Sequence, residues 1–369
     1  MRIAASIAVS LLLLGISGPV LAQNNRHYDL VSPGGMTTVM VDIGADGLTW
    51  ELSRNGQSVM LPSFLTMSLV GGEMLDGWNG KEQVKAVRES KDEWILPLHY
   101  KKDSIRNRYN QLTLTFPKKQ YGVVFRAYDD GAAYRWMTSR KDSLKIRNET
   151  AEFDFPDSDK AWIPYVNDPS PDIYTTSFEN FYRPMRLSEF KKDTLAFLPV
   201  LVDVGNGRKA AILEADLEDY PGMFVGVGTS GVVALKGRFA PYPLEERQGG
   251  HNQLQSLVTR RADYIAVTAG TRSYPWRIIV ISDQDRDLLD NDMVYRLASP
   301  SRVPDTGWIK PGKVAWDWWN DWNISHVDFR AGINTDTYKY YTDFAAQNHI
   351  GYILLDEGWS DPTDLMKIV

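Results

Sequence analysis

Most of the chain alternates apolar and polar residues over short stretches that are separated by turn signals. Thr37–Ile43 and Leu48–Leu52 alternate in this way, and Asn55 and Gly56 then form a pair typical of a hairpin turn. Further stretches follow at intervals of about ten to fifteen residues: 93–96, 111–116, 121–128, 132–136, 200–204, 210–214 and 276–281. This spacing predicts a large antiparallel β-sandwich.

The pattern changes towards the end of the chain. Residues 285–297 predict a helix, and the Pro-rich, polar residues 299–310 predict a linker between domains. Two short apolar stretches, 314–319 and 350–355, then flank a helical pattern over 334–348, which Asn334 or Thr335 can cap. Strand, helix and strand in this order indicate a βα unit of a parallel fold, in which both faces of the second strand are buried.

The first 22 residues predict a signal peptide. Arg2 is followed by roughly 17 apolar residues, which is short for a membrane span. Val20 and Ala22 are small enough for cleavage before Gln23, so we expect export to the periplasm rather than a membrane anchor. No later stretch approaches the length of a span, and we expect none after signal cleavage.

Composition excludes several classes of function. The 369 residues carry a formal net charge of −6, which argues against a nucleic-acid partner, since such proteins usually present a basic face. There is no Cys, so thiol nucleophiles and Cys-zinc sites are excluded. The five His show no metal spacing, and we interpret them as structural.

Candidate chemistry follows the two predicted parallel strands. Residues 308–359 hold six of the twelve Trp. Carboxylates accept hydrogen bonds from hydroxyls and Trp stacks on sugar rings, so acids mixed with Trp at two strand ends indicate binding of an oligosaccharide. Helix capping and core packing are the alternatives for each of the candidate residues, which are Asp317, Trp318, Trp319, Asn320, Asp356, Glu357 and Trp359.

Two other acidic segments are less specific. Glu179 could be a surface acid or a ligand of a hard cation, and the loop 214–223 could be solvated or face an active site. Glycoside hydrolysis needs two carboxyls about 5–9.5 Å apart. Asp356 and Glu357 are neighbours on a strand and point to opposite faces, so they are not that pair by themselves.

Four segments give the chain a resemblance to glycoside hydrolase family 97, a family of α-glucosidases and α-galactosidases. The segments are 176–182, 214–223, 314–320 and 354–359. The resemblance implies a β-super-sandwich over residues 23–298, the linker over 299–310, and the first βα units of an incomplete (β/α)₈ TIM barrel over 311–369.

The resemblance also implies a Ca²⁺ ion held by several glutamates, with Glu179 at the position of the ligand from the N-terminal domain. It implies an exo-acting α-glycosidase whose catalytic acid and base or nucleophile lie on later barrel strands, after Val369. We therefore expect the chain to be an inactive fragment. The 316–319 segment favours the retaining branch. The alternatives are a carbohydrate-binding sandwich without catalysis and a sandwich that only supports the barrel.

Overall fold

The computed structural model describes residues 25–77, 83–166, 173–174, 179–228, 234–250, 253, 255–356 and 358–359. The predicted signal peptide and the candidate Glu357 lie outside these residues.

Nine of the described strands form one antiparallel sheet. Its main path is β1-β2-β3-β4-β10-β16-β15, with β5 beside β4 and β19 beside β10. The bounds are β1 Arg26–Val31, β2 Thr37–Gly44, β3 Gly47–Arg54, β4 Gln57–Leu69, β5 Met74–Leu75, β10 Leu144–Asp154, β15 Met223–Val227, β16 Ala234–Phe239 and β19 Ala266–Thr268.

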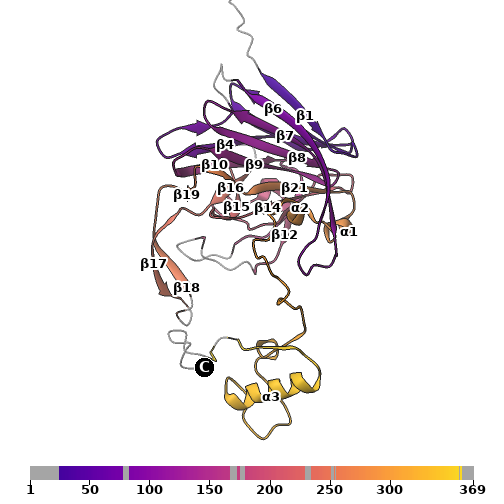
Figure 1. The fold of residues 1–369 in the computed structure, drawn as a ribbon, viewed down its shortest axis with the longest axis vertical. Coiled ribbons are helices and arrows are strands. Elements are labelled where there is room, and N and C mark those ends of the chain that lie inside the picture. Colours follow the sequence, from indigo (N-terminus) through magenta and orange to yellow (C-terminus); the bar gives the residue numbers. More distant parts are fainter. Residues whose placement is uncertain are drawn as a thin grey trace, which may run out of the picture.

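Ten more of the described strands form a second antiparallel sheet, in the order β12-β11-β13-β14-β21-β9-β8-β7-β6, with β20 beside β9. The bounds are β6 Lys85–Ile95, β7 Ile105–Phe116, β8 Tyr121–Tyr128, β9 Gly131–Ser139, β11 Lys160–Ile163, β12 Arg183–Arg186, β13 Val200–Asp203, β14 Lys209–Ala215, β20 Thr271–Ser273 and β21 Trp276–Ser282. Figure 1 shows both sheets in the upper part of the molecule, and the predicted β-sandwich is confirmed.

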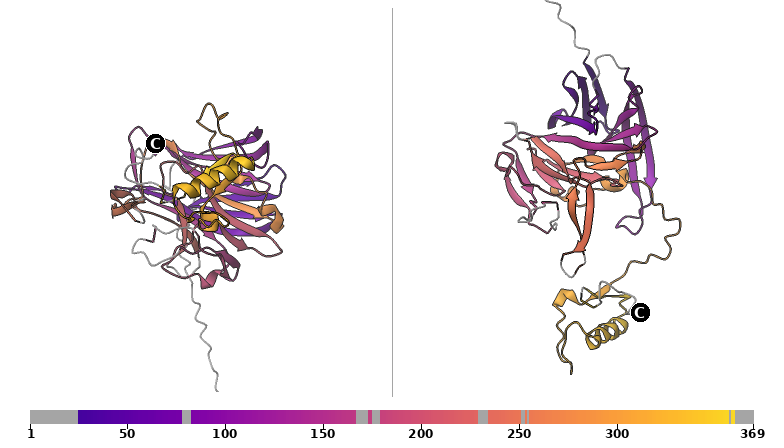
Figure 2. Two further views of the ribbon diagram at one scale, coloured as in Figure 1. Left: turned by 90° about the horizontal axis from the view of Figure 1, so that it is seen from below. Right: turned by 90° about the vertical axis from the view of Figure 1, so that its left-hand side faces the viewer.

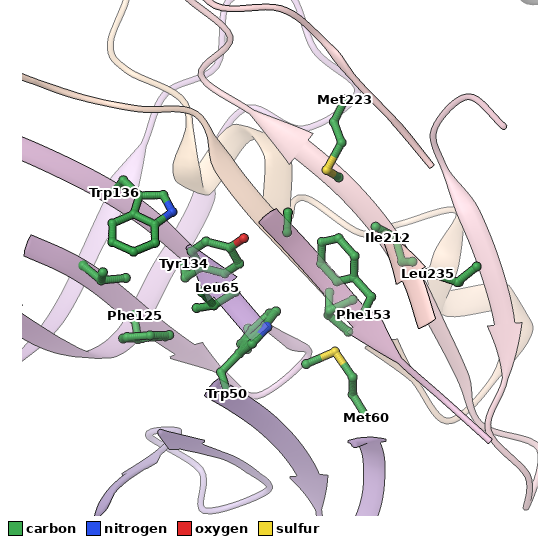
Figure 3. Close-up of a cluster of buried hydrophobic side chains, with 14 of the residues drawn as sticks. Trp50, Met60, Leu65, Phe125, Tyr134, Trp136, Phe153, Ile212, Met223 and Leu235 are labelled. Atoms are coloured by element: carbon green, nitrogen blue, oxygen red, sulfur yellow. The ribbon is translucent and has the colours of Figure 1, made fainter. Parts of the chain in front are cut away.

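The core lies between the sheets because alternate residues of each strand point inward. Trp50 of β3 is almost fully buried, and its ring meets the ring of Tyr134 edge-on, with 5.0 Å between centroids. Phe153 of β10 and Phe125 of β8 also lie against Trp50. Figure 3 shows this cluster of aromatic side chains between strands of both sheets, which it therefore holds together.

A buried ion network also crosses the sandwich. Arg277 of β21 and Glu149 of β10 lie in different sheets, and their side chains are 0% and 1% exposed. The guanidinium donates to both Glu149 oxygens, at 2.9 and 2.7 Å, and to Glu214 at 2.7 Å. Burial alone would lower the pKa of Arg277, but the two carboxylates raise it above its ordinary value.

Two short helices cover the outer face of the second sheet, α1 Asp285–Leu288 and α2 Met293–Leu297. The expectation of one continuous helix over residues 285–297 is therefore wrong. Asn291 Oδ1 accepts a hydrogen bond from the backbone N–H of Met293, and this local bond competes with helix hydrogen bonding between the two segments.

Two smaller units lie outside the large sheets. The hairpin of β17 (Pro243–Gly249) and β18 (Gln255–Arg261) extends away from the sandwich, as Figures 1 and 2 show. The strands β22 (Val314–Trp316) and β23 (Tyr352–Leu354) pair in parallel, and the helix α3 (Thr335–Gln347) connects them. The predicted strand–helix–strand order is confirmed, and Asn334 caps α3 through the backbone N–H of Thr337.

The expected burial of the second parallel strand is wrong. Tyr352, Ile353 and Leu354 are all exposed. Within the described part of the chain, α3 is the one helix with extensive contacts to β22 and β23. A parallel strand becomes buried on both faces only when helices cover both, so one helix leaves these residues accessible.

The last residue of β10 makes stability depend on pH. Burial, together with the nearby Glu152 carboxylate, raises the pKa of Asp154 from 3.8 to about 6, and its Oδ1 has no hydrogen-bond partner among the described residues. The folded protein therefore binds this proton more tightly than the unfolded chain does. The protonated Asp154 side chain therefore contributes its whole share of the folding free energy below the unfolded pKa of 3.8. This contribution is lost as the pH rises to about 6.

We expect Asp154→Asn to unfold at a higher urea concentration than the wild type at pH 7, because the variant keeps a neutral side chain there. The difference should shrink at pH 4, where the wild-type carboxyl is also protonated in the folded state. Urea titrations followed by far-UV circular dichroism at both pH values measure this. A difference of the same size at both would contradict the assignment.

Candidate functional site

The two parallel strands bring two of the predicted acids together. Trp316 pairs with Leu354 in the sheet register, so the strands end at the same level and Asp317 and Asp356 follow them. The backbone N–H of Asp356 donates to Asp317 Oδ1 at 3.3 Å. Trp316 Nε1 donates to Asp356 Oδ2 at 2.8 Å, which fixes that carboxylate against the neighbouring strand. The site is thus centred on Asp317 and Asp356, with the Asp317 carboxylate bound to the backbone of Asp356.

Asp317 is the buried member of this pair, with 1% of its surface exposed. Its Oδ1 also accepts from the Trp318 backbone N–H at 2.8 Å and so caps the 3₁₀ helix Trp318–Asn320. The alternative role as a cap is therefore present at this residue. Oδ2 is buried and has no hydrogen-bond partner among the described residues.

Tyr338 of α3 lies beside Asp317. Burial, with the Asp317 carboxylate as the next cause, raises the Tyr338 pKa to about 12. The phenol therefore stays protonated at neutral pH and can donate a hydrogen bond. Sequence patterns did not indicate Tyr338 or Trp316 as site residues. Helical spacing from the Asn334 cap and the register of the parallel strands are the signals that point to them.

The predicted aromatic residues differ in exposure. Trp319 is 84% exposed, and its ring stacks on Trp316 with 6.0 Å between centroids and an angle of 30°. Trp318 is half exposed and meets Trp322 edge-on. Trp359 is also exposed and borders a cavity of about 540 Å³ between α3 and β23. Trp319 presents the most accessible flat face of the set.

Asn320 has a structural role in this arrangement. Its Oδ1 accepts from the Tyr341 hydroxyl at 2.6 Å, and its side chain donates to the backbone carbonyl of Asn323. These bonds connect the segment after β22 to α3. Both polar atoms of the Asn320 side chain therefore serve local structure, and Asn320 orients the segment that carries Trp318 and Trp319.

The residues present do not by themselves form a Ca²⁺ site. Glu179 is exposed, and the adjacent Asn180 fixes the backbone here through a 2.8 Å bond from Nδ2 to the Tyr165 carbonyl. In the described residues, no group of three or more His, Cys, Asp or Glu is placed to hold a metal. An accessible carboxylate suits Ca²⁺, so Glu179 fits as one ligand that needs further ligands.

The acidic loop that starts at the end of β14 is fixed to the rest of the protein. Asp216 accepts from Arg135 at 3.3 Å and from both the backbone N–H and the hydroxyl of Ser299 at 2.9 Å. Glu218 pairs with Arg302 at 3.2 Å. The loop therefore connects the sandwich to the segment that follows α2.

No helix in the described part of the chain is long and apolar enough to cross a bilayer.

Comparison with known proteins places these features in a family. Residues 30–300 match the family described as Glycosyl-hydrolase 97 N-terminal, and residues 318–368 match Glycoside hydrolase 97. A retaining alpha-galactosidase of Bacteroides thetaiotaomicron is 42% identical over 368 residues, which cover 98% of this chain and 55% of that protein. A probable retaining alpha-galactosidase of Streptomyces bingchenggensis is 25% identical over 95% of this chain and 50% of its own length.

Solved structures share the fold. A Glycoside Hydrolase Family 97 enzyme from Pseudoalteromonas sp. strain K8, in complex with acarbose, has a TM-score of 0.71 at 21% identity and covers 90% of this chain and 48% of that one. A beta-arabinopyranosidase has a TM-score of 0.72 at 19% identity, with coverage of 93% and 53%. The chain spans about half the length of these relatives. On the match over residues 30–300, the chain belongs to glycoside hydrolase family 97.

Proposed function

We propose that this chain is part of an exported, exo-acting α-glycosidase that hydrolyses α-galactosides with retention of configuration. The observation that carries the proposal is the 42% identity to a retaining alpha-galactosidase over 98% of the chain. The Asp356 carboxylate at the end of β23 and the exposed face of Trp319 support it, since such groups bind polyols.

The same proposal assigns a role to each part of the C-terminal segment. Residues 311–369 form the first βα units of a catalytic (β/α)₈ barrel, and β22 and β23 present their C-terminal ends to the substrate. Asp356 and Trp319 bind and orient a sugar hydroxyl and a ring face, and the buried Asp317 positions Asp356 through its backbone N–H. The catalytic acid and nucleophile belong to later barrel strands, so we expect the 369-residue chain alone to be inactive.

Ca²⁺ is proposed as the cofactor, with Glu179 as one ligand. Bound Ca²⁺ would orient the substrate and stabilise charge that develops at the reacting centre. The supporting observations are the exposed carboxylate of Glu179 and its anchorage next to Asn180. The described residues contain no group of three or more His, Cys, Asp or Glu placed to complete the site.

The test is hydrolysis of p-nitrophenyl α-galactoside and α-glucoside by the full-length gene product, with and without a chelator. We expect cleavage of the galactoside, loss of activity with EDTA and recovery with Ca²⁺. The 369-residue chain is assayed in parallel. Absence of activity on both substrates would overturn the proposed function, and activity insensitive to EDTA would overturn the cofactor alone.

Trp319 gives a prediction within this proposal. In the full-length enzyme, Trp319→Ala should raise KM for the galactoside by about tenfold, because one stacked ring contributes on the order of 1 kcal/mol or more, and should change kcat little. Trp308→Ala is the matched control, since Trp308 is exposed but is not one of the candidate site residues. Equal kinetics for the two variants would remove Trp319 from the substrate site.

A further inference from the structure

A second polar pocket lies on the outer face of the sandwich, between the ends of β6 and β7 and the C-terminal end of α2. Its volume is about 630 Å³, which is large enough for a sugar ring. The residues that give it chemical character are Glu93, Trp94, Asn107, Arg126, Arg135 and Arg296. None of the candidate residues at the ends of β22 and β23 lines this pocket.

Two arginines form one wall, and aromatic rings hold both guanidinium groups. Arg126 lies 4.1 Å from the ring centroid of Tyr109 and 4.7 Å from that of Trp276, and Arg135 lies 4.4 Å from the Trp276 ring. These rings fix the guanidinium planes before any ligand arrives. A preorganised pair of guanidinium groups suits a carboxylate, which can accept two hydrogen bonds from one arginine.

The charge of this wall is only partly neutralised within the protein. Arg135 has one carboxylate contact, to Asp216 at 3.3 Å, and its Nε has no hydrogen-bond partner among the described residues. Burial and the neighbouring Arg126 lower the pKa of Arg135, so its charged form is less stable than that of a fully solvated arginine. Arg126 donates its Nε to the neutral Gln111 at 2.9 Å rather than to an acid.

The other charged residues at the pocket are bound to partners within the protein. Arg296 is paired with Asp130 at 2.7 Å. Glu93 accepts from Asn107 Nδ2 at 2.9 Å, which holds this single acidic residue of the lining to a neutral amide. The lining holds three arginines, and Glu93, Asp130 and Asp216 match them in number, so the pocket has no large excess of charge. Arg126 is the guanidinium whose Nε is bound to a neutral amide, and it is therefore the group that favours a carboxylate on the ligand.

An exposed aromatic side chain at the same pocket favours a sugar over a simple anion. Trp94 is 65% exposed although it belongs to the lining. Its indole has an apolar face on which a pyranose ring can stack, while the carboxylate of the same sugar reaches the arginines. Neither phosphate nor a small carboxylic acid would use both features.

We propose that this pocket binds an acidic saccharide, a hexuronate or a chain that ends in one, with its carboxylate on Arg126 and Arg135 and its ring against Trp94. The site is separate from the proposed catalytic function and does not depend on it.

The test is isothermal titration of the 369-residue chain with digalacturonate, galactobiose and inorganic phosphate. We expect digalacturonate to bind at least about tenfold more tightly than galactobiose, since a charge-assisted hydrogen bond is worth this much, and the difference to decrease with added salt. Equal binding of the two disaccharides, or no binding of digalacturonate, would overturn the proposal.

Two variants test the two halves of the pocket. Arg135→Gln should remove the preference for digalacturonate over galactobiose. Trp94→Ala should weaken the binding of digalacturonate and leave the binding of phosphate unchanged. Arg106→Gln and Trp308→Ala are the matched controls, because both side chains are exposed and neither lines the pocket. If circular dichroism shows that Arg135→Gln is unfolded, the Trp94→Ala variant still tests the proposal, because Trp94 is exposed and its replacement should not affect folding. Digalacturonate binding that is unaffected by Trp94→Ala would identify a general anion site and overturn the saccharide assignment.

Discussion

Replacing Arg277 with Met should lower the free energy of unfolding by about 3–5 kcal/mol. The side chain is fully buried and binds Glu149, which has almost no access to water. Removing the cation leaves that carboxylate in the core without a partner, and a buried unpaired charge is far more costly than a lost surface contact. Urea denaturation followed by far-UV circular dichroism measures the loss.

Two further variants separate this cause from general damage to the sheet. The double variant Arg277→Met/Glu149→Leu removes both charges and should recover part of the lost stability. Arg106→Met breaks the exposed pair with Asp92, whose side chains are 53% and 48% accessible, and should change stability by no more than about 0.5 kcal/mol. A double variant no more stable than Arg277→Met would show that the unpaired carboxylate is not the cause.

Trp50→Ala should destabilise the sandwich by about 3–5 kcal/mol, because it leaves a cavity between the sheets. The indole is 1% exposed and contacts Tyr134 and Phe125 of the opposite sheet and Phe153 of its own. Trp50→Phe keeps an aromatic ring there and should lose less. The midpoint of thermal unfolding, read by circular dichroism, gives the order of the variants.

Trp94→Ala is the matched control for this prediction. Trp94 also lies on a strand of the sandwich but is largely exposed, so its loss should change stability by no more than about 0.5 kcal/mol. Similar unfolding midpoints for Trp50→Ala and Trp94→Ala would show that the aromatic cluster does not hold the two sheets together.

The local elements were predictable because their signals lie within a few residues of each other. Alternation places Val39, Val41 and Ile43 inside the sandwich, as the burial of β2 confirms. Asn55 and Gly56 both have positive φ angles, which the hairpin between β3 and β4 requires. The Asn334 cap of α3 is another such short-range signal.

The order of the strands and the inter-sheet contacts were not predictable in this way. Arg277 and Glu149 are 128 residues apart, and no local pattern indicates that they pair. The break between α1 and α2 depends on one side-chain bond at Asn291, which competes with a helical periodicity that continues across it. The exposure of β23 depends on how many elements cover it, which periodicity within the strand does not report.

The candidate site was predictable in part. Acids were expected at the ends of two parallel strands, and the structure places Asp317 and Asp356 there, joined by a bond from the Asp356 backbone N–H to the Asp317 carboxylate. The contact of Trp316 with Asp356 joins residues 40 positions apart, which no local pattern indicates, and the capping role of Asp317 was one of the alternatives that the sequence left open. Glu179 as a Ca²⁺ ligand stays a prediction, because coordination needs several ligands that converge from distant segments.

The hydrogen bonds of Asp216 to Arg135 and Ser299 fix the direction in which the chain leaves the sandwich. Glu214, two residues earlier, is bound to Arg277 in the core, while Asp216 holds Ser299. Polar contacts at Asp216 thus hold the chain where it leaves α2. Salt screens charges that water reaches more than buried ones, so ionic strength would weaken the exposed Arg302–Glu218 pair before it affected the contacts of Asp216.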